Sequence, residues 1–410
     1  MKIRNRLRKI FAVCLIIFVT AGAGLPVHAE TPNLQLYAKA AVLMDADSGR
    51  VLFERCGSEQ LPMASTTKIM TLIVTLENAD LEDTVTVSSY AASMPDVQLN
   101  IRENEQYRLR DLTYSLMLES HNDSAVAIAE HVGGSVEQFA AMMNAKAAEI
   151  GCTGTYFITP NGLDATDGDK IHSTTAEDLA RIMSYCITKS PQKEQFLEIT
   201  RTPAHTFTDI AGTRSFSCTN HNAFLNMMTG ALSGKTGFTN KAGYCYVGAL
   251  RRDGKTFVVA LLACGWPNHK TYKWSDTRCL MEYGLANYSY RSFDEAEIPQ
   301  ETCQPIRVAE AQSGRIGGVE YVKVGLSVNK NEGNDAECEG LLLNESEKIT
   351  VTLHKRKYLT APVAAGERVG YISYSVGNEE WKRVELVTLE EKKAIDFAWC
   401  LRQVLGHWML

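Results

Sequence analysis

The hydrophobic pattern of this 410-residue chain changes twice along its length, and each change limits the fold that can follow. From residue 34 to about 291, helical and strand patterns are mixed. From about 301 to 389, apolar residues occupy alternate positions in short runs, as at Val322, Val324, Leu326 and Val328. Such alternation is typical of a small antiparallel β domain. We therefore predict a boundary near residue 295, with a larger mixed domain over 30–295 and a β-rich domain over 296–389.

The second change comes at residue 390, where apolar residues begin to recur at steps of three and four. They are Ala394, Phe397, Ala398, Leu401, Val404, Leu405 and Trp408, and Asp396, Gln403 and His407 lie on the opposite face. This pattern predicts an amphipathic helix over 390–410 that lies in the plane of a membrane surface, with Arg402 reaching lipid phosphates. Trp399 falls on the polar side and fits less well. The alternative is a helix that packs its apolar face on the β-rich domain.

The first 29 residues have the pattern of an export signal. Five basic residues precede an apolar run from Ile10 to Val19, and Val27 to Ala29 supply a cleavage site. The run is far shorter than the ~20 residues that span a bilayer, so we favour cleavage after Ala29 over a transmembrane anchor. We therefore expect an exported protein at the outer face of the cytoplasmic membrane or in the cell wall.

Composition and charge exclude several classes of protein. With 45% hydrophobic and 22% charged residues, the chain is not a collagen, a disordered tail or a polytopic membrane protein. Removing residues 1–29 leaves 37 basic against 48 acidic side chains, a net charge of −11 that does not suit nucleic acid as a partner. Ten of the eleven cysteines remain without a C-x-x-C pair, and we interpret most as buried small residues rather than a disulfide framework.

A serine and a lysine at the start of one apolar helical pattern are the first candidate catalytic pair. Ser65 and Lys68 are three residues apart, so a helix places both on one face, where the amine can take the hydroxyl proton. The helix N-terminus also offers N–H groups to an oxyanion. A second Ser-x-x-Lys, from Ser190 to Lys193, contains Pro191 and no amphipathic run follows it, so we predict a loop there.

Two later motifs supply the remaining groups. Ser120 and Asn122 follow an apolar helical stretch, where Ser120 could pass a proton between Lys68 and a leaving amine and Asn122 could bind a substrate amide. Lys235, Thr236, Gly237 and Phe238 begin a strand pattern. Lys235 is the cation expected to lower the pKa of Lys68 and, with Thr236, suits a substrate carboxylate. Gly237 lets substrate lie along the strand edge, and the Phe238 N–H is the second expected oxyanion donor.

The three motifs in this order resemble those of the penicillin-recognising serine hydrolases, which comprise penicillin-binding proteins and serine β-lactamases. Further segments are similar to the low-molecular-mass D-alanyl-D-alanine carboxypeptidases: residues 62–68, 159–163 before Ser173 and Thr174, 220–222, 235–239 with 242–244, and 361–370. The resemblance covers essentially the whole mature chain. It implies an α/β (α+β) catalytic domain of the transpeptidase and β-lactamase type, with a five-stranded antiparallel sheet flanked by helices, and then a β-rich domain.

The activity implied by the resemblance is a serine carboxypeptidase. Ser65 would attack the carbonyl between the two terminal D-alanines of a peptidoglycan pentapeptide stem, release one D-alanine and form an acyl-enzyme that water hydrolyses. β-Lactam antibiotics would be covalent inhibitors. No cofactor is expected, and no metal, since the chain lacks H-E-x-x-H. Members often have a basic residue where this chain has His221. They also often have an arginine after the strand that follows the third motif, and the nearest counterpart here is Lys273 or Arg278. Which of these residues assists carboxylate binding is therefore left open.

Two other functions remain open at this point. A β-lactamase would use the same Ser65 and Lys68 but needs a glutamate base, and the loop from Gly162 to Ser173 contains none. A catalytically weak peptidoglycan-binding module is the alternative from another class. Acylation by a fluorescent penicillin would separate the binding module, and the lifetime of that adduct would separate the β-lactamase.

Overall fold

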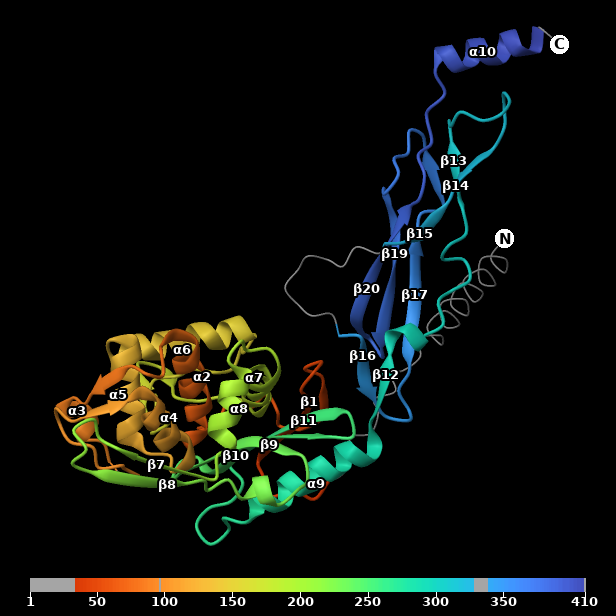
Figure 1. The fold of residues 1–410 in the computed structure, drawn as a ribbon. Helices are drawn as coiled ribbons and strands as arrows, with labels where there is room; N and C mark the ends of the chain where they lie inside the picture. The colour runs from red at the N-terminus through yellow and green to blue at the C-terminus, as the bar shows by residue number, and fades with distance from the viewer. Residues whose placement is uncertain (1–33, 96, 328–337, 409–410) are drawn as a thin grey trace, which may run out of the picture. The chain divides into compact units, whose positions relative to one another are not determined.

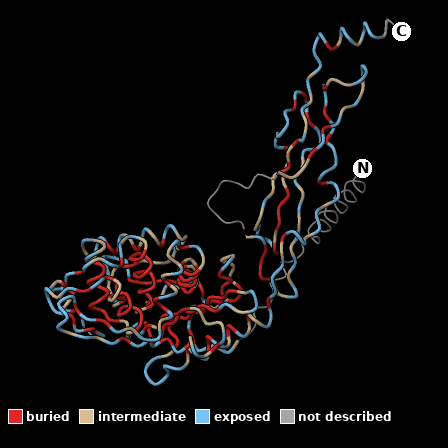
Figure 2. The backbone as a smooth tube through the Cα atoms, in the orientation of Figure 1, coloured by how far each residue is buried: buried red, intermediate tan, exposed pale blue. Residues whose placement is uncertain are grey.

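The computed structural model describes residues 34–95, 97–327 and 338–408, so the export signal predicted over 1–29 lies outside the described residues. Figure 1 shows a helix-rich region from β1 to α9 and a β-rich region from β12 onward. Buried residues are most numerous in the helix-rich region (Figure 2). No helix in the described ranges is both long enough and apolar enough to cross a membrane.

A five-stranded antiparallel sheet forms the centre of the first region. Its order is β2 (Val51–Arg55), β1 (Ala40–Asp45), β11 (Lys255–Leu262), β10 (Gly243–Arg252) and β9 (Ala231–Thr239). The β10–β11 hairpin turns at Asp253 and Gly254, which both have positive φ, as a two-residue turn between twisted strands requires. Strand β9 is an edge strand of this sheet, so the backbone groups on its outer side have no neighbouring strand of the sheet and can pair with an added extended peptide.

Helices cover both faces of the sheet, as expected (Figure 1). On one face Val42 and Met44 of β1 join the large core. On the other face Leu43 packs close to Gly284 of α9. The helices are α2 (Lys68–Asn78), α3 (Ser89–Ala92), α4 (Leu109–Leu118), α5 (Asn122–Gly133), α6 (Val136–Ile150), α7 (Ala176–Thr188), α8 (Lys193–Arg201) and α9 (Tyr272–Asn287), with short turns η1 (Ala64–Thr67) and η2 (Ala223–Asn226).

Three small two-stranded sheets complete this region. They pair β3 (Thr84–Thr86) with β4 (Gln106–Arg108), β5 (Thr166–Asp167) with β6 (Lys170–Ile171), and β7 (Ala204–Thr208) with β8 (Ser215–Thr219). The prediction of a loop around the second Ser-x-x-Lys holds up to Gln192 and is wrong at Lys193, where helix α8 begins. Ser190 instead donates to Glu77 at 2.6 Å, which uses its hydroxyl structurally.

The β-rich region contains three sheets around two small cores. Strands β15 (Val324–Leu326), β20 (Glu379–Thr388), β19 (Arg368–Val376) and β17 (Ile349–Lys355) form the largest, and β14 (Glu320–Val322), β13 (Ile306–Ala309) and β18 (Tyr358–Thr360) form the second. The third pairs β12 (Ser289–Ser292) with β16 (Gly340–Leu343), and turn η3 (Phe293–Glu295) follows β12. The first strand of the β-rich region, β12, therefore lies before the boundary predicted near residue 295. The β13–β18 pair is parallel, unlike the antiparallel pattern expected.

The C-terminal helix is shorter than predicted. Helix α10 spans Phe397–Trp408, whereas Lys392 and Ala394 form extended bridges to Val363 and Ala311. These backbone bonds compete with helix formation up to residue 395. Asp396 then caps the helix, because its carboxylate accepts from the Trp399 N–H at 2.7 Å.

The cysteines differ partly from the expectation. The ten in the described ranges form no disulfide. Four of them, Cys186, Cys218, Cys245 and Cys264, are buried, and the others are half-buried or exposed. Buried cysteines are therefore a minority, because the other six lie in turns, on α9 and α10, or in loops of the β-rich region.

Candidate active site

Ser65 and Lys68 lie together at the start of the buried helix α2. Ser65 is in the 3₁₀ turn η1, and Lys68 is the first residue of α2. The Lys68 Nζ and Ser65 Oγ atoms are 2.9 Å apart. The spacing of the two residues in the sequence therefore gives the contact that a serine nucleophile and its base require.

The Lys68 amine has no access to solvent and two further hydrogen-bond acceptors. It donates to Asn122 Oδ1 at 2.9 Å and to the Asn161 carbonyl at 2.6 Å. Burial lowers the pKa of Lys68 well below its ordinary value, and the positive charge of Lys235 lowers it further, while Asp123 opposes this. The neutral amine that proton abstraction needs is therefore favoured.

Ser120 and Lys235 form the second pair of the site. Lys235 Nζ donates to Ser120 Oγ at 2.9 Å, from β9 to the turn between α4 and α5. Burial lowers the pKa of Lys235 to about 7. Its charge therefore acts on Lys68 most strongly below that pH. Ser120 has φ +68°, a left-handed conformation that non-glycine residues adopt mainly where the surroundings impose it.

Two glycines, Gly237 and Gly162, allow neighbouring segments to pack directly against the backbone of η1. A Cβ atom on Gly237 of β9 would lie 2.8 Å from the Ser65 nitrogen. A Cβ atom on Gly162, which has φ +86°, would lie 2.1 Å from the Ala64 carbonyl oxygen. Any larger residue at either position would push η1, the turn that contains Ser65, away from its neighbours.

The remaining predicted residues adjoin these two pairs, since Asn122 contacts Lys68, and Thr236 and Phe238 follow Lys235 on β9. Asn122 Nδ2 donates to the Pro95 carbonyl, so in this structure both ends of its amide are engaged, one of them by Lys68. Thr236 is half-buried beside Lys235 on β9. The exposed Phe238 ring packs on Tyr244, with ring centroids 4.7 Å apart.

A small pocket of about 70 Å³ adjoins Ser120 and Lys235 and is lined also by Asn222. The Asn222 Nδ2 amide is buried and has no hydrogen-bond partner among the residues described. Its Oδ1 atom accepts from Tyr246 at 3.0 Å, which fixes the orientation of the amide. A buried donor without a partner is rare and is satisfied when a ligand supplies an acceptor.

The three basic residues considered for carboxylate binding have other contacts. His221 lies 2.6 Å from Glu119 at the rim of the pocket. Lys273 is buried, with its amine 4.6 Å from the Tyr244 ring centroid, and burial lowers its pKa. Arg278 is exposed and donates weakly to the Met227 carbonyl.

Sequence analysis missed the role of His172. Its Nδ1 atom accepts from the Ile158 and Thr159 N–H groups, so the proton lies on Nε2, which contacts Thr67 Oγ1 at 2.9 Å. Burial lowers its pKa to about 4. The neutral imidazole thus connects η1 to the segment whose Asn161 carbonyl accepts from Lys68. No sequence signal marks this residue, since its contact to η1 joins positions 105 residues apart.

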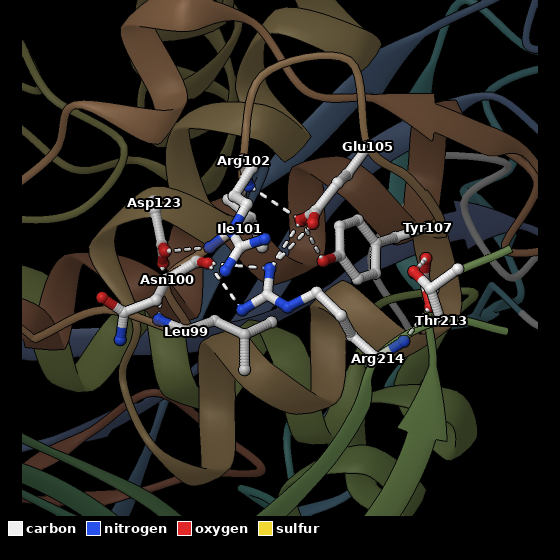
Figure 3. Close-up of polar contacts among 10 residues, drawn as sticks. Leu99, Asn100, Ile101, Arg102, Glu105, Tyr107, Asp123, Thr213 and Arg214 are labelled. Atoms are coloured by element: carbon white, nitrogen blue, oxygen red, sulfur yellow. Dashed lines mark hydrogen bonds and ion pairs between the residues drawn. The ribbon is translucent and has the colours of Figure 1, made fainter. Parts of the chain in front are cut away.

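A second missed cluster supports the loop next to Asn122. Figure 3 shows Arg214 of the β7–β8 turn beside Glu105 and the Asn100 carbonyl, with Tyr107 on the same carboxylate. Asp123 accepts from the Leu99 and Ile101 N–H groups. The loop that offers the Pro95 carbonyl to Asn122 is therefore held from two sides.

Replacing Arg214 should weaken this support. We expect Arg214→Met to lower the free energy of unfolding by about 1–3 kcal/mol, since Glu105 loses its charged donor. Burial opposes ionisation of Glu105, but bonds from Tyr107 and Arg214 lower its pKa overall. The stability that the ionised Glu105 contributes is fully present above the pKa of a carboxyl in the unfolded chain. It is lost as the pH falls through the lowered pKa of Glu105 in the folded protein. Urea unfolding at pH 7 and at pH 3 checks this, and an equal loss at both values would contradict it.

Comparisons with known proteins agree with this geometry. The sequence model described as D-alanyl-D-alanine carboxypeptidase matches residues 26–263, and that of the penicillin-binding protein 5 C-terminal domain matches 343–394. The chain is 24% identical over 405 residues to D-alanyl-D-alanine carboxypeptidase DacF of Bacillus subtilis, covering 97% of each chain. It is 34% identical over 254 residues to DacB2 of Mycobacterium tuberculosis, covering 61% of this chain and 82% of the relative.

Solved structures show the same arrangement. A D-alanyl-D-alanine carboxypeptidase of Mycobacterium tuberculosis is similar at a TM-score of 0.57 and 32% identity, covering 64% of this chain and 96% of the other. Penicillin binding protein 5 of Haemophilus influenzae has the same fold at a TM-score of 0.66 and 24% identity, covering 88% and 99%. The second comparison includes the β-rich region.

Proposed function

Since this chain belongs to the D-alanyl-D-alanine carboxypeptidase family, we propose that Ser65 is the nucleophile with which it removes the terminal D-alanine of a peptidoglycan pentapeptide. The observation that carries the assignment is the buried Lys68 amine 2.9 Å from Ser65 Oγ, with a lowered pKa. A nucleophilic serine needs such a base within hydrogen-bond reach.

In acylation, the neutral Lys68 amine takes the Ser65 proton as Oγ bonds to the carbonyl carbon between the two D-alanines. The backbone N–H groups of Ser65 and Phe238 are the proposed donors to the oxyanion. When the C–N bond breaks, the departing amine needs a proton, which Lys68 returns through Ser120. Water then attacks the ester, with the same base taking its proton, and Ser65 is restored.

The substrate is proposed to lie along the free edge of β9. Strand addition would place its last carboxylate near Lys235 and Thr236. The unpaired Asn222 amide offers a further donor in the adjoining pocket. Asn122 holds Lys68 in place, and its Nδ2 group can turn to substrate only by leaving the Pro95 carbonyl.

Mass spectrometry of a cell-wall pentapeptide incubated with the purified mature protein tests this function. We expect a product lighter by one alanine together with free D-alanine. An unchanged pentapeptide, with no labelling by a fluorescent penicillin, would instead indicate the non-catalytic binding module.

The same labelling separates the carboxypeptidase from a β-lactamase. In the loop from Gly162 to Ser173, Asp164 lies 3.2 Å from Thr239 and Asp167 lies 3.3 Å from Tyr156. These carboxylates already serve as structural acceptors, which supports a long-lived penicillin adduct. Loss of the label within seconds would favour the β-lactamase.

We propose that residues 1–29 export the protein and that α10 holds it on the outer face of the cytoplasmic membrane. Phe397, Leu401, Val404 and Leu405 of α10 are between 47% and 83% exposed. This exposure supports membrane contact over packing on the β-rich region.

Changing two of these residues tests the membrane contact. We expect Leu401→Gln with Leu405→Gln to release the enzyme from vesicles, with a more than tenfold lower partition coefficient, because each leucine gains roughly 2 kcal/mol on burial. Thermal stability and D-alanine release should not change, since both side chains are exposed. A drop of several degrees in melting temperature would indicate packing on the protein instead.

A further inference from the structure

The loop between β13 and β14 presents two aliphatic side chains that the fold does not use. In residues 312–319, here the 312–319 loop, Ile316 is 62% and Val319 is 52% exposed. The Gly318 N–H donates to the Arg315 carbonyl, and Gly317 has φ +77°, so the chain turns tightly with Ile316 at its tip. A tight turn favours small or polar residues, so an exposed isoleucine there needs another explanation.

Trp399 joins this loop to helix α10. Its side chain is only 6% exposed, and its indole Nε1 donates to the Ser313 carbonyl at 3.3 Å. Gln312 Nε2 donates to the Ala394 carbonyl and to Asp396. The contacts hold the first turn of α10 against the loop, and they explain why Trp399 falls outside the apolar face of the helix. The loop and α10 therefore lie at the same end of the β-rich region (Figure 1).

The charge of these two segments differs from that of the chain. Neither the 312–319 loop nor α10 contains an aspartate or a glutamate, while each contains one arginine, Arg315 and Arg402. The whole chain carries 48 acidic against 42 basic residues. Two carboxylates border these segments: Asp396 caps α10, and Glu320 is paired with Lys392. The segments themselves are net positive and apolar, which makes them complementary to anionic phospholipids and less so to a second copy of the same acidic chain.

We propose that the 312–319 loop is a second membrane-contacting element, with Ile316 and Val319 entering the headgroup region and Arg315 meeting lipid phosphates. The proposal rests on α10 lying at the membrane. Trp399 joins the two contact points, so together they restrict the orientation of the β-rich region on the lipid surface. A single helix attached through an extended segment would leave that orientation free.

Binding of the purified mature protein to vesicles tests the loop. The vesicles contain three parts phosphatidylcholine and one part phosphatidylglycerol, and partition coefficients are measured by flotation. We expect Ile316→Gln with Val319→Gln to lower the coefficient about tenfold, since two apolar side chains lose their burial in lipid. The matched control is Ile210→Gln with Ile298→Gln, two exposed isoleucines elsewhere, which should bind like wild type.

The outcomes separate this proposal from the one on which it rests. If the loop variant binds like wild type while Leu401→Gln with Leu405→Gln is released, α10 is the anchor and the loop inference is wrong. If neither variant loses binding, the α10 proposal itself fails. If sedimentation shows that the loop variant instead breaks a dimer and keeps its vesicle affinity, the surface is an interface between copies. D-Alanine release from a soluble pentapeptide should be equal in all variants.

Discussion

Ser65→Ala should abolish both D-alanine release and covalent penicillin labelling. Both reactions need the Oγ atom to form an acyl-enzyme, and alanine offers no replacement, so we expect a loss on the order of 10⁴-fold or more. The fold should remain, because within the described residues Ser65 Oγ makes only a long 3.4 Å contact to the Asn161 carbonyl besides its bond from Lys68. Mass spectrometry of the pentapeptide and of the penicillin-treated protein measures the two losses.

A matched control comes from the second Ser-x-x-Lys of the chain. Ser190→Ala removes the serine of an equal sequence pattern, whose hydroxyl donates to Glu77. We expect slightly lower stability and full activity, because Ser190 and Lys193 do not line the pocket that Ser120 and Lys235 line. Labelling that survives in Ser65→Ala and disappears in Ser190→Ala would reverse the assignment of the nucleophile.

Lys68→Arg should be nearly inactive although it keeps the positive charge. A guanidinium cannot give up its proton near neutral pH, whereas the Lys68 amine is buried and its pKa is lowered. We expect kcat for D-alanine release to fall about 10³-fold or more. The matched control is Lys193→Arg, which should retain wild-type kcat. An active Lys68→Arg enzyme would contradict the role of Lys68 as base.

The pH dependence of acylation tests the same assignment in the wild type. With Lys68 as the proposed base, only its neutral amine takes the proton, so the acylation rate should rise with pH and level off below the ordinary lysine pKa of about 10.4. Lys235, whose pKa is about 7, loses its charge over part of this range. Binding of a substrate carboxylate should then weaken, so KM should rise above about pH 7 while kcat does not fall. A rate that rises only near pH 10 would indicate an unperturbed base.

The extent of each element depended on both local and distant contacts. The helical spacing after Ser65 correctly predicted a helix, and Asp396 is a helix cap that a close reading of the sequence could locate. The start of α10 was nevertheless predicted too early, because Lys392 and Ala394 bond to strands far away in the chain. Strand β12 was assigned to the wrong side of the boundary for the same reason, since its partner β16 begins fifty residues later.

The sequence by itself determined the order of the three motifs, the spacing of Ser65 and Lys68 and the change from mixed to alternating periodicity, because these follow from local helix and strand geometry. The third motif also pointed to Lys235 as the cation near Lys68, but only the tertiary structure decided which acceptors hold the Lys68 amine. Asn161 and Lys235 come from segments 93 and 167 residues beyond Lys68 in the chain, and His172 supports the first of these contacts. Burial, and with it the lowered pKa of Lys68, arises when these segments close around it, since removal of solvent depends on all packed neighbours together.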